Sequence, residues 1–169
     1  MRMELRAGLL AAALLLPSAS FAAGEKPVGP AAWEKARDDA RRWTDAVLAA
    51  AAKAGAENVP GFRSEMERAW GMAQNAESAE RRLNEQRLRA APKQAAQEQK
   101  ILELNLLYVY GCLLPEILEE SAMTYAPGRG RAGGELARPI DETRYQAESG
   151  ALSRSLNLPA ELAPRMPAL

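Results

Sequence analysis

The stretch Ile101-Leu-Glu-Leu-Asn-Leu-Leu-Tyr-Val-Tyr-Gly-Cys-Leu-Leu114 decides the fold. Its apolar residues cover every face of a helix, which is typical of a helix buried on all sides. A transmembrane helix needs about 20 apolar residues, but Glu103 and Asn105 interrupt this stretch and only Leu106 to Leu114 is free of polar residues. We therefore expect no transmembrane helix in the mature chain. We place a helix from about Lys93 to Leu114 at the centre of a bundle, where it packs against Trp33, Trp43, Met66 and Trp70.

Two amphipathic helices are predicted before this stretch. Apolar residues recur every three or four positions from Trp33 to Ala54 with charged residues between them, and Gly55 follows as a signal that ends a helix. We expect Val59-Pro60-Gly61 to form a connector. A second apolar stripe predicts a helix from Phe62 to about Ala90, although Glu80 falls on the apolar line.

The chain after the apolar helix is rich in glycine and proline. Pro115 removes one backbone hydrogen bond and should kink the helix. A glycine-rich loop then runs to Pro139, and a polar segment follows from Asp141 to Leu156. Prolines recur in residues 157–169, so we expect an extended or disordered tail there. The predicted fold is mainly α: an exported helical bundle, one domain over residues 23–156, with a Gly/Pro-rich loop and a Pro-rich C-terminal tail.

Residues 1–22 have the three-part layout of a secretory signal peptide. Two arginines precede the apolar run Leu9–Leu16, and Ser20 and Ala22 supply the small residues that cleavage requires. The apolar run is too short to cross a bilayer as an anchor. We expect cleavage near Ala22 and a protein that is periplasmic in a Gram-negative bacterium or loosely associated with its outer membrane. No cysteine follows the run that could carry a lipid anchor.

The composition excludes several classes of function. The chain has no histidine and one cysteine, which rules out catalysis with an imidazole base, His-ligated metals and an intrachain disulfide framework. Its 22 basic and 22 acidic residues give zero net charge, so we expect no nucleic-acid partner. We predict neither a cofactor nor a metal. Cys112 lies in an apolar run and is interpreted as a small buried hydrophobe in preference to an intermolecular disulfide.

Three further sequence patterns resemble functional sites, but each has a structural explanation. Gly128–Gly133 has the spacing Gly-x-Gly-x-x-Gly, yet no β-strand precedes it as a dinucleotide site requires, so we interpret it as a basic loop. The glutamates in 116–120 indicate a solvated or capping face, because a di-iron bundle also needs histidine. We expect a salt-bridged helix surface at Arg81, Arg82, Arg87 and Arg89. No pair of carboxylates lies in an apolar context that would shift its pKa, so we predict no enzyme.

The apolar helix and the residues after it resemble the central signature of the DotC family, called TraI in conjugative plasmids, of type IVB secretion systems. In that family an apolar segment with an Asn leads to a Leu-Pro-Pro-Val-type turn and an acidic residue, and an Asp-Arg-Thr-Tyr segment follows. The resemblance spans about Glu67 to Ala147, and Glu116 stands where the family has its second proline. The residues that carry the resemblance are Asn105, Leu114, Pro115, Ile117, Glu120, Asp141 and Tyr145.

The resemblance implies a non-enzymatic subunit of the outer-membrane core complex of a type IV secretion or conjugation system. Such a subunit binds partner proteins and helps a secretin-like component reach the outer membrane. Two alternatives stay open. One is a soluble periplasmic helical adaptor or chaperone that is unrelated to secretion, and the other is an enzyme or inhibitor that uses carboxylates alone, which the sequence disfavours.

We expect the partner-binding surface between Pro115 and Pro139, together with the proline-rich tail. Loops carry function when a rigid scaffold positions them, and this loop joins a proline to groups of both charges. A plain surface linker is the alternative, because glycine and arginine also describe a linker. The charged residues of the candidate surface are Glu116, Glu119, Glu120, Arg129 and Arg131.

Overall fold

A computed structural model of the chain describes residues 32–55, 58–128, 130–136, 138 and 141–164. The expected signal peptide lies outside these residues. The described chain is mainly α-helical, with four helices and no strand in those ranges. The helices are α1 (Ala32–Lys53), α2 (Val59–Ala90), α5 (Glu142–Leu156) and one continuous helix made of α3 (Ala95–Tyr108), the π-helical η2 (Val109–Leu113) and α4 (Leu114–Tyr125). Short 3-10 turns are η1 (Pro92–Gln94), η3 (Gly130–Gly133) and η4 (Ala160–Leu162).

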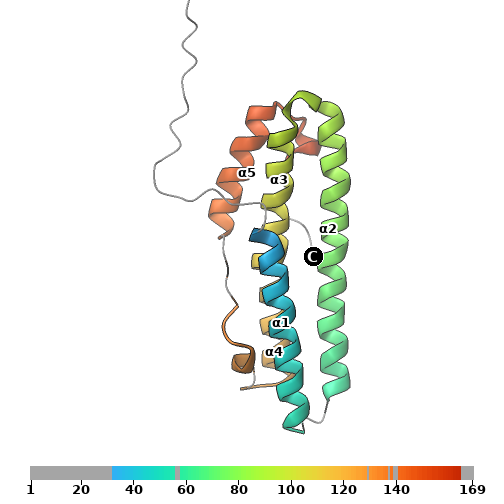
Figure 1. The fold of residues 1–169 in the computed structure, drawn as a ribbon, viewed down its shortest axis with the longest axis vertical. Coiled ribbons are helices and arrows are strands. Elements are labelled where there is room, and N and C mark those ends of the chain that lie inside the picture. Colours follow the sequence, from blue (N-terminus) through green and yellow to red (C-terminus); the bar gives the residue numbers. More distant parts are fainter. Residues whose placement is uncertain (1–31, 56–57, 129, 137, 139–140, 165–169) are drawn as a thin grey trace, which may run out of the picture.

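Three columns of helix make up the bundle (Figure 1). One column is α2 and the second is the continuous helix α3–η2–α4, which packs against α2 along its length. The third column is shared by two helices. In its lower half α1 contacts α2, α3, η2 and α4, and in its upper half α5 contacts α3. The start of α1 and the start of α5 both lie near the middle of the bundle (Figure 1).

The continuous helix lies at the centre of the core, as its all-round apolarity predicted. Ile101 and Val109 have no exposed surface. Two of the expected neighbours, Trp33 and Trp70, place their rings 6.2 Å and 6.3 Å from the ring of Tyr110, and Met66 and Trp43 belong to the same buried cluster. The helix from residue 92 to 125 is long and apolar enough to cross a membrane, but 72% of its most apolar window is buried inside the bundle.

The helix ends follow local capping chemistry. Gly55 has a φ of 64°, a left-handed conformation that favours glycine, and α1 ends just before it, as predicted. The expected connector at residues 59–61 is wrong, because α2 already begins at Val59. The side chain of Asn58 accepts a hydrogen bond from the Gly61 amide at 3.1 Å, and Pro60 lies in the first turn, where no amide hydrogen is needed.

Pro115 changes the helix just before it without ending it. The amide of Leu114 donates to the carbonyl of Val109, five residues back, so η2 is a π-helical turn. Such a turn accommodates a proline, which cannot donate and whose ring crowds the preceding turn. The continuous helix then runs on to Tyr125.

The described part of the tail, which was expected to be extended or disordered, contains one short helical turn between extended residues. Residues Ala160–Leu162 form the 3-10 turn η4, which packs against α2. Residues 165–169 lie outside the described residues.

Candidate functional site

A short segment after α4 lies across the lower part of the bundle, and we call its described residues, 130–136 and 138, the strap. The strap contacts α1 and α4. The indole Nε1 of Trp43 donates to the carbonyl of Gly134 at 2.8 Å, and Leu136 is 7% exposed within the main apolar cluster. Arg138 forms an ion pair with Glu119 of α4 at 2.6 Å. The strap is therefore fixed by one apolar anchor, one hydrogen bond and one ion pair.

The strap needs glycine where it meets Trp43. A Cβ atom built on Gly133 would lie 2.6 Å from Cδ1 of the indole ring, which is closer than two carbon atoms can approach. Gly134 has a φ of 80°, a left-handed conformation that side chains rarely adopt. Gly133, the last glycine of the Gly-x-Gly-x-x-Gly pattern, thus lets the backbone pack closely on Trp43.

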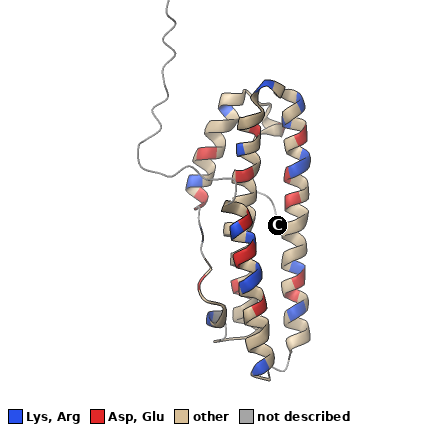
Figure 2. Cartoon of the chain, viewed as in Figure 1, with Lys and Arg blue, Asp and Glu red and all other residues tan. Residues whose placement is uncertain are grey.

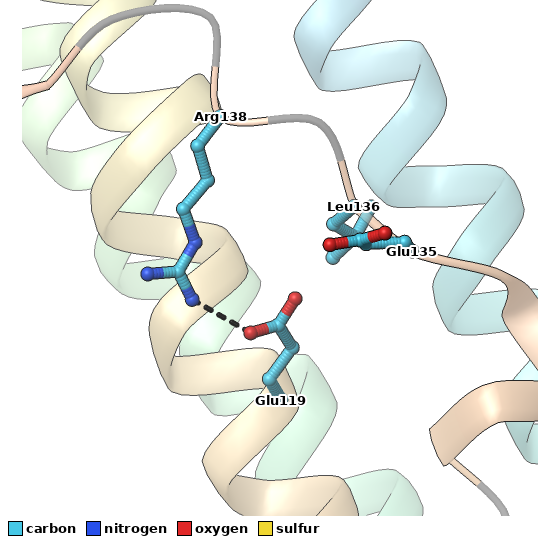
Figure 3. A pocket seen from close by; sticks show the side chains of 4 residues that line it. All are labelled: Glu119, Glu135, Leu136 and Arg138. Carbon is cyan, nitrogen blue, oxygen red and sulfur yellow. Dashed lines mark hydrogen bonds and ion pairs between the residues drawn. The ribbon is translucent and has the colours of Figure 1, made fainter.

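Two shallow hollows flank the strap. The larger, of about 550 Å³, is lined by Glu119, Glu135, Leu136 and Arg138 (Figure 3). The second, of about 470 Å³, lies against α1 and shares Glu135 and Leu136 with the first. The carboxylate of Glu135 is exposed and has no ion-pair partner among the described residues. This surface can receive a side chain of opposite charge.

The predicted charged residues of this region are only partly brought together. Glu119 is half-buried and contacts the strap, whereas Glu116, Glu120 and Arg131 are exposed. Arg129 lies outside the described residues. The cation that pairs with α4 is Arg138, which the sequence analysis did not single out.

A second polar site is buried between α2 and α3, near the other end of the bundle. Arg87 and Glu98 have no exposed surface, and Glu80 is 4% exposed. Nη2 of Arg87 lies 3.8 Å from Oε2 of Glu80. Two sequence-based expectations are therefore wrong: Arg87 is not on a salt-bridged surface, and two carboxylates do lie in an apolar context. The surface interpretation holds for Arg81, which is exposed and paired with Glu77 at 2.6 Å, and Arg82 and Arg89 are exposed as well. Figure 2 shows acidic and basic residues along α2.

Hydrogen bonds connect these groups to α5 and to the tail. The Asn105 amide donates to Oε2 of Glu80 at 2.5 Å, and Tyr145 of α5 donates its hydroxyl hydrogen to Oδ1 of Asn105 at 2.7 Å. Nε of Arg87 donates to the carbonyl of Leu162 in η4 at 2.7 Å. We call the five residues that form this site the polar cluster: Glu80, Arg87, Glu98, Asn105 and Tyr145.

Burial shifts the pKa values of the ionisable groups in the polar cluster. It raises the pKa of Glu80, while the Asn105 hydrogen bond and the charge of Arg87 oppose that shift. It also raises the pKa of Glu98, opposed only by the charge of Arg87, and it lowers the pKa of Arg87. Each shift favours the neutral form of its group, which is the effect expected when charge is removed from water.

The residues that carry the family resemblance lie in different parts of the structure. Asn105 and Tyr145, forty positions apart, form one hydrogen bond in the polar cluster. Asp141 caps α5 by accepting from the Arg144 amide at 2.6 Å. The remaining four lie together on α4: Leu114 and Pro115 are buried, Ile117 is half-buried and Glu120 is exposed.

Sequence reasoning missed Glu80, Arg87 and Glu98, yet one signal pointed to them. Glu80 interrupts an otherwise apolar stripe, and Arg87 follows seven residues later, so both lie on one face of α2. A carboxylate and a guanidinium on the buried face of a helix indicate a buried pair.

No arrangement of three or more His, Cys, Asp or Glu suited to a metal ion occurs in the part of the chain that the structure describes. Comparisons with protein families, with curated proteins and with solved structures found no match for this chain.

Proposed function

We propose that this chain is a non-enzymatic protein-interaction subunit and that the surface around the strap is its docking site. The observation that carries the proposal is the unpaired carboxylate of Glu135 beside two hollows. The other described surface offers little apolar area, since Met123 is its single exposed large apolar side chain, at 69%. A partner therefore docks through polar contacts, and we expect it to bring a Lys or Arg side chain to Glu135.

The proposed setting is the periplasm, in the outer-membrane core complex of a type IV secretion or conjugation system. The resemblance to the DotC family and the signal-peptide layout of residues 1–22 support this setting. The contact between Asn105 and Tyr145 adds support, because it gives two residues of the resemblance a shared structural role.

Purification from the producing cell tests both parts of the proposal. After crosslinking, the tagged protein should carry outer-membrane secretion or conjugation subunits that mass spectrometry identifies. Glu135→Lys reverses the charge at the hollows and Gly133→Ala pushes the strap off Trp43. Each should reduce the recovered subunits by about tenfold, or about 1.4 kcal/mol. Gly71→Ala is the matched control, since a Cβ there meets nothing within 4 Å.

The outcomes separate the two parts. If no secretion subunit is recovered with the unaltered protein, the secretion role is wrong and the soluble adaptor is the better interpretation. If the subunits are recovered equally with both variants, the partner docks elsewhere on the helices. Circular dichroism of each variant checks that the bundle is intact.

A further inference from the structure

The polar cluster contains ionisable groups that the bundle leaves unsatisfied. Both carboxyl oxygens of Glu98 and both terminal nitrogens of Arg87 are buried without a hydrogen-bond partner. Leaving such a group unpaired costs about 1–3 kcal/mol, and more when the group is charged. A proton on Glu98 removes the negative charge from one of these groups without any movement of the chain.

Counting charges identifies the carboxyl group that takes the proton. With all groups ionised, Glu80, Arg87 and Glu98 sum to −1 at a site where all three side chains are buried. Glu80 has a donor in Asn105 and a cation in Arg87, whereas the carboxyl of Glu98 has no donor. A proton on Glu98 therefore makes the cluster neutral.

Among the described residues, Arg87 is the one charged group that shifts the pKa of Glu80 and of Glu98. From α5 the facing group is the Tyr145 phenol, whose pKa burial raises further, and it stays neutral. Tyr108 of α3 stacks on it with ring centroids 4.5 Å apart and is also neutral at physiological pH. From η4 the facing group is the Leu162 carbonyl.

The same cluster holds the C-terminal part of the bundle, α5 with η4, which we call the arm. The arm is joined to α2 by the bond from Arg87 to Leu162 and to α3 by the bond from Tyr145 to Asn105. Its apolar contact is a cluster separate from the main core, formed by the buried Leu104, Leu107, Tyr108 and Tyr145 together with partly buried side chains such as Leu152. Because this cluster has fewer buried residues than the main core, polar contacts contribute a larger share of what keeps the arm docked.

We propose that Glu98 is a proton-binding site that controls docking of the arm. When Glu98 is neutral, Arg87 pairs with Glu80 and donates to the carbonyl of Leu162, and the arm stays docked. When Glu98 ionises, its charge attracts the unpaired nitrogens of Arg87 and requires water, which weakens the bond to Leu162 and loosens the arm. Loosening exposes the apolar face of α3 that carries Leu104 and Leu107.

Hydrogen exchange followed by mass spectrometry tests this proposal on the whole protein. Exchange in residues 142–162 is measured between pH 4.5 and 8 and divided by the intrinsic rate at each pH. Glu98 is protonated while the arm is docked and has an ordinary glutamate pKa once the arm is open. The fraction of open arm should therefore rise about tenfold per pH unit above the ordinary glutamate pKa. It should level off at the pH where Glu98 also ionises in the docked state. Exchange in residues 62–73, far from the cluster, should not follow this change.

Glu98→Gln keeps the shape of the neutral side chain at every pH and should keep the arm protected throughout. Glu103→Gln on the same helix is the matched control and should behave as the unaltered protein, because Glu103 is only half-buried and bonds to Gln99. The proposal is wrong if the unaltered arm exchanges equally at all pH values. It is also wrong if the pH dependence persists in Glu98→Gln and disappears in Glu80→Gln, which would assign the proton to Glu80.

Discussion

The hydroxyl group of Tyr145 links α5 to the polar cluster. The Tyr145 hydroxyl donates to Asn105, whose amide in turn donates to Glu80. Tyr145→Phe removes the donor and leaves a buried amide oxygen unpaired, so we expect the free energy of unfolding to fall by about 1–3 kcal/mol. Urea unfolding followed by circular dichroism measures the change.

Tyr125→Phe is the control for that measurement. Tyr125 stacks on Phe62 with ring centroids 6.0 Å apart, and its hydroxyl has no hydrogen bond in the described part of the chain. If both variants lost the same free energy of unfolding, the hydrogen bond from the Tyr145 hydroxyl would not stabilise the fold.

At the level of single residues, sequence patterns locate polar exceptions but not their partners. The interruption at Glu80 is visible in the stripe of α2, and its position alone predicts burial. That Arg87 and Glu98 are buried with it depends on how α2 meets α3 across a turn, which periodicity does not encode. Asn105 was found through a resemblance, and its bond to Tyr145 depends on the docking of α5.

The central helix carries the largest stability prediction at the level of elements. Leu107 of α3 is 1% exposed, in the small apolar cluster beneath α5. Leu107→Asp places an unpaired charge there and should cost about 3–5 kcal/mol, a large fraction of the stability of a small domain. Thermal unfolding compares it with Met123→Asp, which changes an exposed position and should leave the melting temperature nearly unchanged. If Leu107→Asp left the melting temperature unchanged, we would conclude that α3 is not part of the core.

Element types were predictable from the sequence, whereas their junctions depended on local chemistry. In α1 and α2, apolar and charged residues alternate with the period of a helix, and this pattern predicts a helix and not a strand. Pro115 alone could not distinguish a kink from a π-helical turn, because the outcome depends on the burial of Tyr110 within η2 and of Leu114 just after it. The strap was predicted as a loop, but its contact with Trp43 joins residues ninety-one positions apart.

At the level of the whole molecule, the strap packs on α1 and α4, whereas the polar cluster lies on α2, α3 and α5. Figure 1 shows α3 and α5 in the half of the bundle away from α4. Partner docking at the strap and proton binding at Glu98 can therefore be disturbed separately. Glu135→Lys should leave hydrogen exchange of the arm unchanged, and Glu98→Gln should leave recovery of partners unchanged at acidic pH.

The most apolar helix also determines how the whole molecule behaves toward membranes. The helix from residue 92 to 125 has the length and composition of a membrane span, yet 72% of its most apolar window is covered by the other helices. Inserting it into a bilayer would require α1, α2 and α5 to leave their packing and would move the polar cluster into hydrocarbon, where unpaired polar groups cost several kcal/mol each. We therefore expect the protein without residues 1–22 to remain in the aqueous phase after Triton X-114 partitioning and not to float with phospholipid vesicles. Recovery in the detergent phase or with the vesicles would mean that the bundle opens and that this helix is a membrane segment.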